Sequence, residues 1–384
     1  MAASGLDRPR IDMLDLPRQQ ESLGAALTEA IREAIVNAEY LPGRLSAEPT
    51  TPFEAKLADY CDRRFAVGVG SGTSALHLAL LAAGVGPEHQ VVTAPNSFFA
   101  TAEAIVQTGA RPVFADVDPV THLVGAGSVE PVLTSATGAV VPVHLYGNVV
   151  DVDGIEAMLD RVGREDVAVI EDCAHAMGAG FDSRAVPLGP VGAFSFNPVK
   201  NLGGLSDGGA VVTDDHEIAR RVRLLANHGS TPDATHEVLG FNSRLGSLND
   251  RVLSIKIDHL DAWNDRRRAI AARYDAVFRK LDGVEPVGTG PDTRHARHQY
   301  VVCLDDRERV RDRLAAAGIA TRIHYPSLIP ATPAFVARGY SVRVPEASRL
   351  NALILSLPCH PELEPDDVEY VIEHVAGALA EGGR

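Results

Sequence analysis

Short apolar runs alternate with amphipathic stretches from about residue 65 to 230. The apolar runs, which predict buried strands, cover residues 91–95, 111–117, 139–144, 167–172, 192–196 and 208–214. Stretches with a helical pattern lie between several of them, at residues 74–84, 100–109, 152–163 and 216–229, and each ends at a glycine suited to a helix C-cap. Continuous apolar strands that alternate with helices are typical of a mostly parallel sheet covered on both faces. We therefore expect an α/β fold for this part of the chain.

A different pattern follows residue 245. Residues 245–281 contain no proline and keep a helical pattern, which predicts one helix of about 36 residues. A strand at 299–304, a helix at 307–318, a strand at 320–326 and a closing helix at 364–380 come next. We therefore expect residues 1–245 to hold an N-terminal helix (20–40) and a large α/β domain, and residues 246–384 to hold the linking helix and a small α+β domain.

Composition limits the class of protein. The chain has 36 basic and 51 acidic residues, a formal net charge of −15, which disfavours binding to nucleic acid. No run of eighteen apolar residues is present, and the first residues lack the apolar core of a secretion signal, so we expect a cytoplasmic protein without a membrane span. The four cysteines, at positions 61, 173, 303 and 359, lie far apart without the spacing of metal ligands. We expect reduced thiols and no metal site.

Only four of the 36 basic residues are lysines. Lys56, Lys256 and Lys280 fall at charged positions of amphipathic helical stretches, an ordinary role. Lys200 differs, because it follows the apolar run VGAFSF and opens the glycine-rich stretch NPVKNLGGLSDGG. A lysine that emerges from a buried strand can become a nucleophile toward an aldehyde, since burial lowers its pKa.

A glycine-rich turn precedes a buried helix in the segment FAVGVGSGTSALHLAL. Glycines at positions 68, 70 and 72 allow a ligand to approach the backbone, and hydroxyl residues at 71, 73 and 74 can cap the helix or bind an anion. The segment is not the dinucleotide-binding fingerprint, because Thr73 replaces its last glycine, and no Gly-Lys pair follows to make a P-loop. Alone, the turn fits a phosphate site and an ordinary capped helix start equally well.

Two carboxylates end the predicted strand in VAVIEDCAHAMGA. Open α/β sheets bind ligands at this edge, and a buried Asp172 would stay ionised beside a cationic ligand such as a pyridinium nitrogen. His175 lies three residues further on and can contact the same ligand. Taken in isolation, Glu171 and Asp172 also fit solvated charges at a strand end, and His175 fits a core histidine.

The three segments together meet the needs of pyridoxal phosphate (PLP). Its phosphate binds at a helix N-terminus, its protonated ring nitrogen pairs with a carboxylate, and its aldehyde condenses with a lysine. The turn at 70–74, Asp172 and Lys200 follow one another along a single predicted sheet. The combination therefore favours a PLP enzyme.

Several segments are similar to those of one family. They are VGVGSGTSALHLAL, PNSFFATAEAIVQTGARPVFADVDP, VPVHLYGNVVDVDGI, VIEDCAHAMGA, FSFNPVKNLGGLSDGGAVVTDD, NHGS, GFNSRL and TRIHYP. With them the chain, from about residue 15 to 376, resembles the DegT/StrS family of sugar aminotransferases. The resemblance implies the PLP-dependent transferase fold type I: a large domain whose mostly parallel mixed sheet is covered by helices, and a small α+β C-terminal domain. It also implies a cofactor that alternates between PLP and pyridoxamine phosphate.

The resemblance assigns catalytic roles to three positions. Lys200 matches the Schiff-base lysine that later moves a proton, and Asp172 matches the acid paired with the pyridine nitrogen. His175 matches the residue near the phenolic oxygen of the cofactor.

Five further positions match cofactor contacts of the family. Gly72, Thr73 and Ser195 match phosphate contacts, and Phe98 matches the aromatic residue that stacks on the cofactor. Asn242, in GFNSRL, matches the asparagine that reaches the phosphate of the neighbouring subunit. The resemblance therefore implies a homodimer with shared active sites.

The implied reaction is transamination. An amino group passes from L-glutamate or L-glutamine to a nucleotide-linked keto-sugar, first of all a dTDP-linked 3-keto- or 4-keto-6-deoxysugar, in amino-sugar biosynthesis for an antibiotic or a polysaccharide. NPVK is similar to a form found in some 4-amino enzymes, and GGLSDGG to one found in 3-amino enzymes, so the aminated carbon stays open. The stretches PGRLSAEPTTPFEAK and LGSLND depart from the family pattern near the substrate side. A keto-cyclitol of the scyllo-inosose type is the alternative substrate.

Other classes fit less well. Sugar dehydratases of the same fold generally replace the lysine with histidine, and a regulator without activity would lose the lysine or the aspartate, whereas Lys200 and Asp172 are both present. His324 and Tyr325, in TRIHYP, are candidates for contact with the substrate or the donor carboxylate. The stretch HARH at 295–298 has two histidines, but with no further ligand expected nearby it predicts no metal site.

Overall fold

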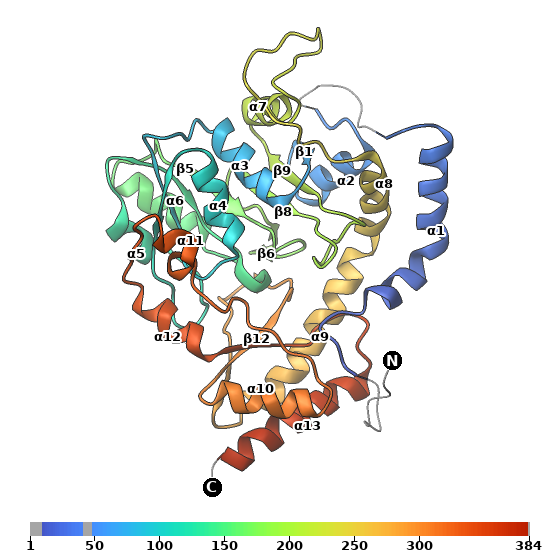
Figure 1. Ribbon diagram of the computed structural model, residues 1–384, viewed down its shortest axis with the longest axis vertical. Helices are drawn as coiled ribbons and strands as arrows, with labels where there is room; N and C mark the ends of the chain where they lie inside the picture. Colours follow the sequence, from blue (N-terminus) through green and yellow to red (C-terminus); the bar gives the residue numbers. More distant parts are fainter. Residues whose placement is uncertain (1–9, 41–47, 383–384) are drawn as a thin grey trace.

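The computed structural model describes residues 10–40 and 48–382 (Figure 1). Its central feature is a seven-stranded sheet in the order β1-β9-β8-β5-β4-β2-β3. The strands are β1 (Phe65–Val69), β2 (Gln90–Thr93), β3 (Arg111–Phe114), β4 (Thr137–Val141), β5 (Ala168–Asp172), β8 (Val191–Ser195) and β9 (Gly209–Thr213). The strands from β8 to β3 pair in parallel, and β9 pairs antiparallel with β8 and β1. The expectation of a mostly parallel mixed sheet is confirmed.

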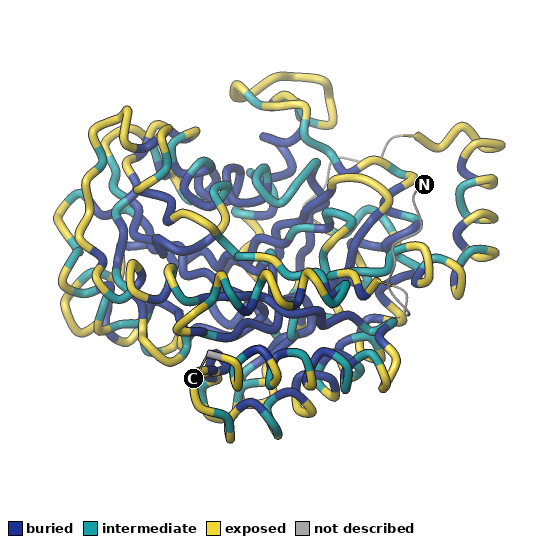
Figure 2. Tube along the Cα trace, turned by 60° about the horizontal axis from the view of Figure 1, so that its bottom comes forward, coloured by how far each residue is buried: buried dark blue, intermediate teal, exposed yellow. Residues whose placement is uncertain are grey.

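Helices cover both faces of this sheet, and its strands are buried between them (Figure 2). One face carries α3 (Gly72–Ala82), α4 (Phe99–Gln107) and α7 (His216–Ala226), and the other carries α2 (Pro52–Tyr60), α6 (Val152–Arg161) and α8 (Ser247–Lys256). In β5, Val169 joins the core beside α6, whereas Ile170 joins the core beside α3. Because successive strand side chains point to opposite faces, Glu171 and Asp172 project to opposite sides of the sheet.

The four helices predicted between the strands are all present. The glycine that follows each of them, Gly84, Gly109, Gly163 or Gly229, has a φ between 67° and 88°. This left-handed conformation favours glycine, which confirms the expected caps at Gly84, Gly109 and Gly163, whereas after α7 the position next to the C-cap is taken by His228, with a φ of 58°, and Gly229 follows it.

A second sheet is built from the last third of the chain. It is antiparallel, in the order β10-β12-β13, with β10 (Val284–Pro286), β12 (Tyr300–Leu304) and β13 (Ile354–Leu357). α9 (Leu260–Phe278), α10 (Arg307–Ala316) and α13 (Pro365–Gly382) share its hydrophobic core. The prediction of a strand at 320–326 is wrong: Arg322 makes a single bridge to Ser356, and the residues after it leave this second sheet and contact the segments that follow β4 and β5.

Short elements complete the described chain. A small sheet, in the order β11-β6-β7, contains β6 (Gly180–Phe181), β7 (Arg184–Ala185) and β11 (Thr293–Arg294). The remaining helices are α5 (Ala126–Val129), α11 (Pro333–Val336), α12 (Pro345–Leu353) and the 3₁₀ turns η1 (Glu130–Val132), η2 (Leu145–Gly147) and η4 (Ile329–Ala331). None of the helices in the described ranges combines the length and the apolar character that a bilayer crossing requires.

The predicted single helix at 245–281 is two helices. α8 and α9 are joined by the 3₁₀ turn η3 (Ile257–His259), and together they form a column that runs from the large sheet to the second sheet (Figure 1). A 3₁₀ turn joins residues three apart by hydrogen bonds, whereas an α-helix joins residues four apart, so the turn interrupts the α-helical register.

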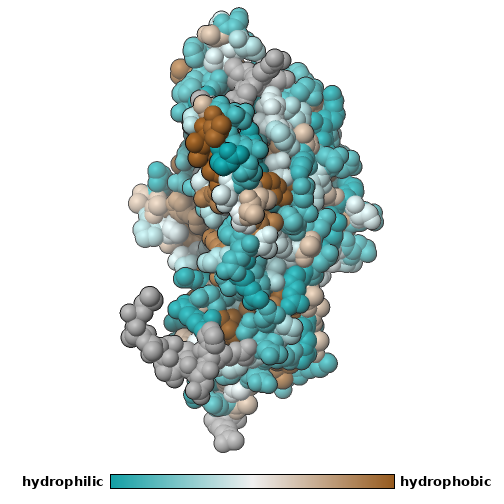
Figure 3. Space-filling model, turned by 90° about the vertical axis from the view of Figure 1, so that its right-hand side faces the viewer, coloured by the Kyte–Doolittle hydropathy of each residue, from teal (hydrophilic) through white to brown (hydrophobic). Residues whose placement is uncertain are grey.

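The N-terminal helix α1 (Leu16–Val36) packs against α8. Leu23 and Leu27 form a small core with Val252, while Ile35 and Val36 at the end of the helix are exposed. The face of the molecule that carries α1 is largely hydrophilic, with separate apolar patches (Figure 3).

Candidate active site

A cavity of about 330 Å³ opens where β5 and β8 end, beside the N-terminus of α3. It brings together nine of the residues that the sequence indicates: Gly72, Thr73, Phe98, Asp172, His175, Ser195, Lys200, His324 and Tyr325. Asn242 is the exception, because it lines a separate cavity beside α3. The structure thus places the expected residues of one chain around a single space.

The anion-binding turn forms one wall of the cavity. Ser71 caps α3 by accepting a hydrogen bond from the Ser74 N–H at 3.1 Å, so the free N–H groups of the first turn lie at the cavity wall. A Cβ atom on Gly72 would lie 2.6 Å from the Cβ of Ser195, closer than such atoms approach. Glycine is therefore required at this position, and backbone donors together with Ser195 form a cradle for an anion.

Asp172 lies on the cavity side of β5. Its carboxylate accepts hydrogen bonds from Thr101 Oγ1 at 2.8 Å and from the Ala174 N–H at 3.1 Å. Burial raises the pKa of Asp172. Burial disfavours the ionised carboxylate, and a cation in the cavity, such as a protonated pyridine nitrogen, would offset this and keep it ionised.

Glu171, on the opposite side of β5, is fully buried, so its interpretation as a solvated charge is wrong. Its carboxylate accepts hydrogen bonds from the Leu188 N–H at 2.9 Å, the Gly189 N–H at 2.6 Å and Nε2 of His144 at 2.7 Å. His144 also donates its main-chain N–H to the Asp172 carbonyl oxygen at 3.1 Å. This network holds the end of β5 in place.

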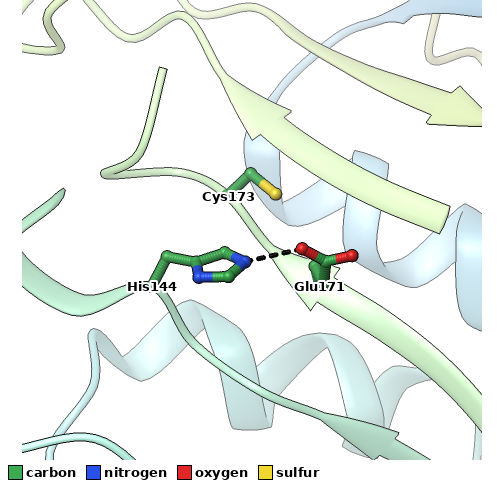
Figure 4. Close-up of side chains that lie close together, drawn as sticks. All are labelled: His144, Glu171 and Cys173. Carbon is green, nitrogen blue, oxygen red and sulfur yellow. Dashed lines mark hydrogen bonds and ion pairs between the residues drawn. The ribbon is translucent and has the colours of Figure 1, made fainter. Parts of the chain in front are cut away.

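Cys173 completes a group of potential metal ligands with His144 and Glu171 (Figure 4), whose donor atoms lie within 4.8 Å of one another. The sequence predicts no such cluster. Nδ1 of His144 accepts the Val150 N–H at 3.0 Å, so Nε2 carries the proton that Glu171 accepts. Burial raises the pKa of the Cys173 thiol well above its usual value. Two of the three groups are thus hydrogen-bonded to each other and the third is a neutral thiol, which fits a structural network.

Lys200 lies in the wall of the same cavity, at the start of the glycine-rich loop that follows β8. Burial lowers the pKa of its amine to about 8, while the nearby Asp172 opposes that change. A substantial fraction of the amine is then neutral near pH 7.5, which makes Lys200 a competent nucleophile.

Two aromatic residues and a histidine close the cavity. Phe98 and Tyr325 lie with their ring centroids 5.4 Å apart, and Tyr325 Oη lies 3.2 Å from Nε2 of His175. Nδ1 of His175 accepts the Tyr146 N–H at 3.3 Å, so this ring is oriented from both nitrogens.

His298 also lines the cavity, although the sequence gives it no role. Its ring centroid lies 4.5 Å from that of His175, and its Nδ1 lies 3.0 Å from Oδ1 of Asn201. The stretch HARH contains this histidine, but only its tertiary contacts with His175, after β5, and Asn201, after β8, distinguish His298 from its neighbours in the sequence.

These features fit PLP. The cradle at Gly72 suits its phosphate, the buried carboxylate of Asp172 suits its ring nitrogen, and the amine of Lys200 suits its aldehyde. Fold and site together thus define a PLP-dependent transferase.

Comparisons with known proteins place the chain within this class. Residues 23–376 match the DegT/DnrJ/EryC1/StrS aminotransferase family. The chain is 39% identical over 372 residues to a Geobacillus stearothermophilus protein named pleiotropic regulatory protein, with 95% of this chain and 98% of the relative covered. It is 39% identical over 375 residues to the dTDP-3-amino-3,4,6-trideoxy-alpha-D-glucose transaminase of Streptomyces venezuelae, with 97% of each covered. The crystal structure of S. venezuelae DesV matches with a TM-score of 0.91 and 39% identity, covering 96% of this chain and 98% of DesV. The chain belongs to the DegT/DnrJ/EryC1/StrS aminotransferase family, and it is a PLP-dependent sugar aminotransferase.

Proposed function

We propose that this enzyme transfers an amino group from L-glutamate or L-glutamine to C3 of a dTDP-linked keto-6-deoxysugar in amino-sugar biosynthesis. The S. venezuelae relative, named for a dTDP-linked 3-amino sugar, supports both the nucleotide and the carbon. In this chain, the main support for the proposal is a second cavity that adjoins the cavity around Lys200 and Asp172.

This outer cavity has a volume of about 880 Å³. Four residues line both cavities: Val199, His298, Gln299 and His324. The outer cavity also carries Arg10, Arg311 and Arg322, which suit a diphosphate, and apolar Leu14 and Ile319, which suit a base. A substrate with a sugar at the inner end and a nucleoside diphosphate at the outer end fits this arrangement better than a free cyclitol.

Lys200 and Asp172 carry the proposed chemistry. Bound PLP supplies an aldehyde that receives the amino group and a ring that accepts electron density. Lys200 holds the cofactor and then accepts and returns a proton at the carbon that bears the amino group. Asp172, oriented by Thr101, would pair with the ring nitrogen of the bound cofactor, and His175 would contact its phenolic oxygen.

The remaining contacts position the cofactor. Gly72, Thr73 and Ser195 would hold the phosphate of the cofactor, and Phe98 would stack on its ring. His324 and Tyr325 contact the substrate. All of these residues line the cavity, which supports their place in the site.

Asn242 acts across a homodimer in this proposal. It lies outside the cavity of its own chain, where its Oδ1 accepts a hydrogen bond from Arg244 at 3.1 Å. It follows a segment at 229–241 that projects from the molecule (Figure 1), in which Leu239 is 98% exposed, with Val238 and Phe241 also exposed. Apolar side chains on a projecting segment favour contact with a second copy of the chain, which would bring Asn242 to the partner's phosphate site.

Product analysis tests the substrate. The purified enzyme, L-glutamate and a panel of dTDP-linked 3-keto-sugars, dTDP-linked 4-keto-sugars and a free keto-cyclitol are incubated, and the amino products are identified by mass spectrometry and NMR. We expect amination at C3 of a dTDP-linked sugar. Amination of the cyclitol alone would contradict the proposal and support the alternative substrate, and faster reaction with L-glutamine would identify the donor.

A further inference from the structure

His298 stands at the junction of the two cavities. It lines the cofactor cavity together with Lys200 and the outer cavity together with Arg322. A substrate that extends from one cavity into the other therefore passes the imidazole ring of His298.

A chain of hydrogen bonds fixes which ring nitrogen of His298 carries the proton. Nδ2 of Asn264 donates to the Met177 carbonyl oxygen at 3.0 Å, so Oδ1 of Asn264 is free to accept from Nδ2 of Asn201 at 2.7 Å. Nδ2 of Asn201 also donates to the Ala296 carbonyl oxygen at 2.9 Å. Carbonyl oxygens only accept, so both amide orientations are determined. Oδ1 of Asn201 must then accept a hydrogen bond from Nδ1–H of His298 at 3.0 Å.

The other ring nitrogen, Nε2, is left as a free acceptor. Burial, with His175 and Lys200 nearby, lowers the pKa of His298 well below its usual value, so the ring is neutral. Nε2 then carries a lone pair and makes no hydrogen bond with a residue in the described part of the chain. Neutral acceptors repel phosphate and carbonyl oxygens and attract hydroxyl groups.

We propose that His298 is a specificity-determining residue whose Nε2 accepts a hydrogen bond from a sugar hydroxyl of the amino acceptor. The inference rests on the proposed function, because it requires a sugar between the reacting carbon and the nucleotide. A substrate that lacks this hydroxyl leaves Nε2 unpaired at the junction, and such a site discriminates strongly between hydroxylated and deoxygenated substrates.

Three variants separate this role from a structural one. His298→Phe keeps a planar ring and removes the acceptor, whereas His298→Gln places an amide oxygen near the position of Nε2. His259→Phe is the matched control, because His259 is exposed and stacks on Trp263 away from both cavities. The donor half-reaction with L-glutamate and the acceptor half-reaction with the keto-sugar are followed separately through the visible band of the bound cofactor.

In His298→Phe, we expect kcat/KM of the acceptor half-reaction to fall about 10- to 100-fold more than kcat/KM of the donor half-reaction. In His298→Gln, kcat/KM of the acceptor half-reaction should recover. With a substrate analogue that lacks the contacted hydroxyl, kcat/KM of wild type should fall to the value of His298→Phe. The kcat/KM of His298→Phe itself should not fall further with this analogue. Equal losses in both half-reactions, or a variant that still prefers the hydroxylated substrate, would overturn the assignment.

Binding without turnover gives an independent readout. In a Lys200→Ala background, calorimetry should show the keto-sugar binding about 10- to 100-fold more weakly when His298 is replaced by Phe. Equal dissociation constants would contradict the role of His298. If wild type aminates no sugar at all, the proposed function itself fails, and that outcome is distinct from both results.

Discussion

Tyr325 Oη accepts a hydrogen bond from Nε2 of His175 at 3.2 Å, across the cavity between the two halves of the chain. The direction follows from Nδ1 of His175, which accepts the Tyr146 N–H and leaves the ring proton on Nε2. The hydroxyl proton of Tyr325 therefore remains available for a group bound in the cavity.

Replacing Tyr325 with Phe tests this contact. The change removes one neutral hydrogen bond and the free donor, so kcat/KM should fall about 3- to 10-fold while the thermal midpoint changes little. Tyr40→Phe is the control, because its hydroxyl donates to the Ile35 carbonyl oxygen on the exposed end of α1. Unchanged kinetics in Tyr325→Phe would remove Tyr325 from the site.

Replacing Gly72 with Ala tests the phosphate cradle. The new Cβ would meet Ser195 at 2.6 Å, and overpacking of this kind costs about 1–3 kcal/mol. We expect the dissociation constant for PLP, from a spectroscopic titration of the cofactor-free protein, to rise about 5- to 100-fold. Gly24→Ala is the control: no atom lies within 4 Å of its added Cβ on α1, so PLP affinity should not change. Equal affinity in Gly72→Ala and wild type would place the phosphate elsewhere.

The rate of cofactor binding should depend on pH through Lys200. Only the neutral amine attacks the aldehyde, and burial lowers the pKa of Lys200 to about 8. The rate of reconstitution of the cofactor-free protein with PLP should therefore rise with pH and reach half its maximum near pH 8. Free Nα-acetyl-lysine, with an ordinary pKa of about 10.4, should show its midpoint at higher pH. A protein midpoint coincident with that of the free amine would contradict the effect of burial.

Mixing two inactive variants tests the shared active site. In the proposed dimer, each site uses Lys200 of one chain and Asn242 of the other. A heterodimer of Lys200→Ala with Asn242→Asp has one site with both native residues, so a 1:1 mixture after subunit exchange should recover about a quarter of wild-type activity. Activity that stays at the mean of the two separate variants would show that Asn242 does not act across subunits.

The large sheet and most of its cavity could be predicted from the sequence, because their signals are local. Apolar runs and glycine caps mark the strands and helices. Asp172 and Ser195 end neighbouring parallel strands, so their arrival at one edge of the sheet follows from the topology. The isolated lysine in a glycine-rich loop then indicated the chemistry.

The sequence indicated His324 and Tyr325 as candidates for the site, but the contacts that the later residues make could not be predicted, because their partners lie far away in the sequence. Residues 320–326 are predicted as a strand, but Tyr325 instead contacts His175 in the loop that follows β5. His298 is held in the cavity wall by a hydrogen bond to Asn201, which lies 97 residues earlier in the chain. Glu171 is buried because the N–H groups of Leu188 and Gly189 fold back onto it. The division of the chain at residue 245 stays a prediction.

The visible spectrum of the purified protein tests the central claim most directly. Wild type with PLP should show the absorption band of the lysine-bound cofactor. L-glutamate should bleach it, and a dTDP-linked keto-sugar should restore it. Lys200→Ala should show neither the band nor its response. A wild-type protein that binds PLP but shows no change with L-glutamate or L-glutamine, or a Lys200→Ala variant that responds as wild type does, would contradict the assignment of Lys200 as the catalytic residue of an aminotransferase.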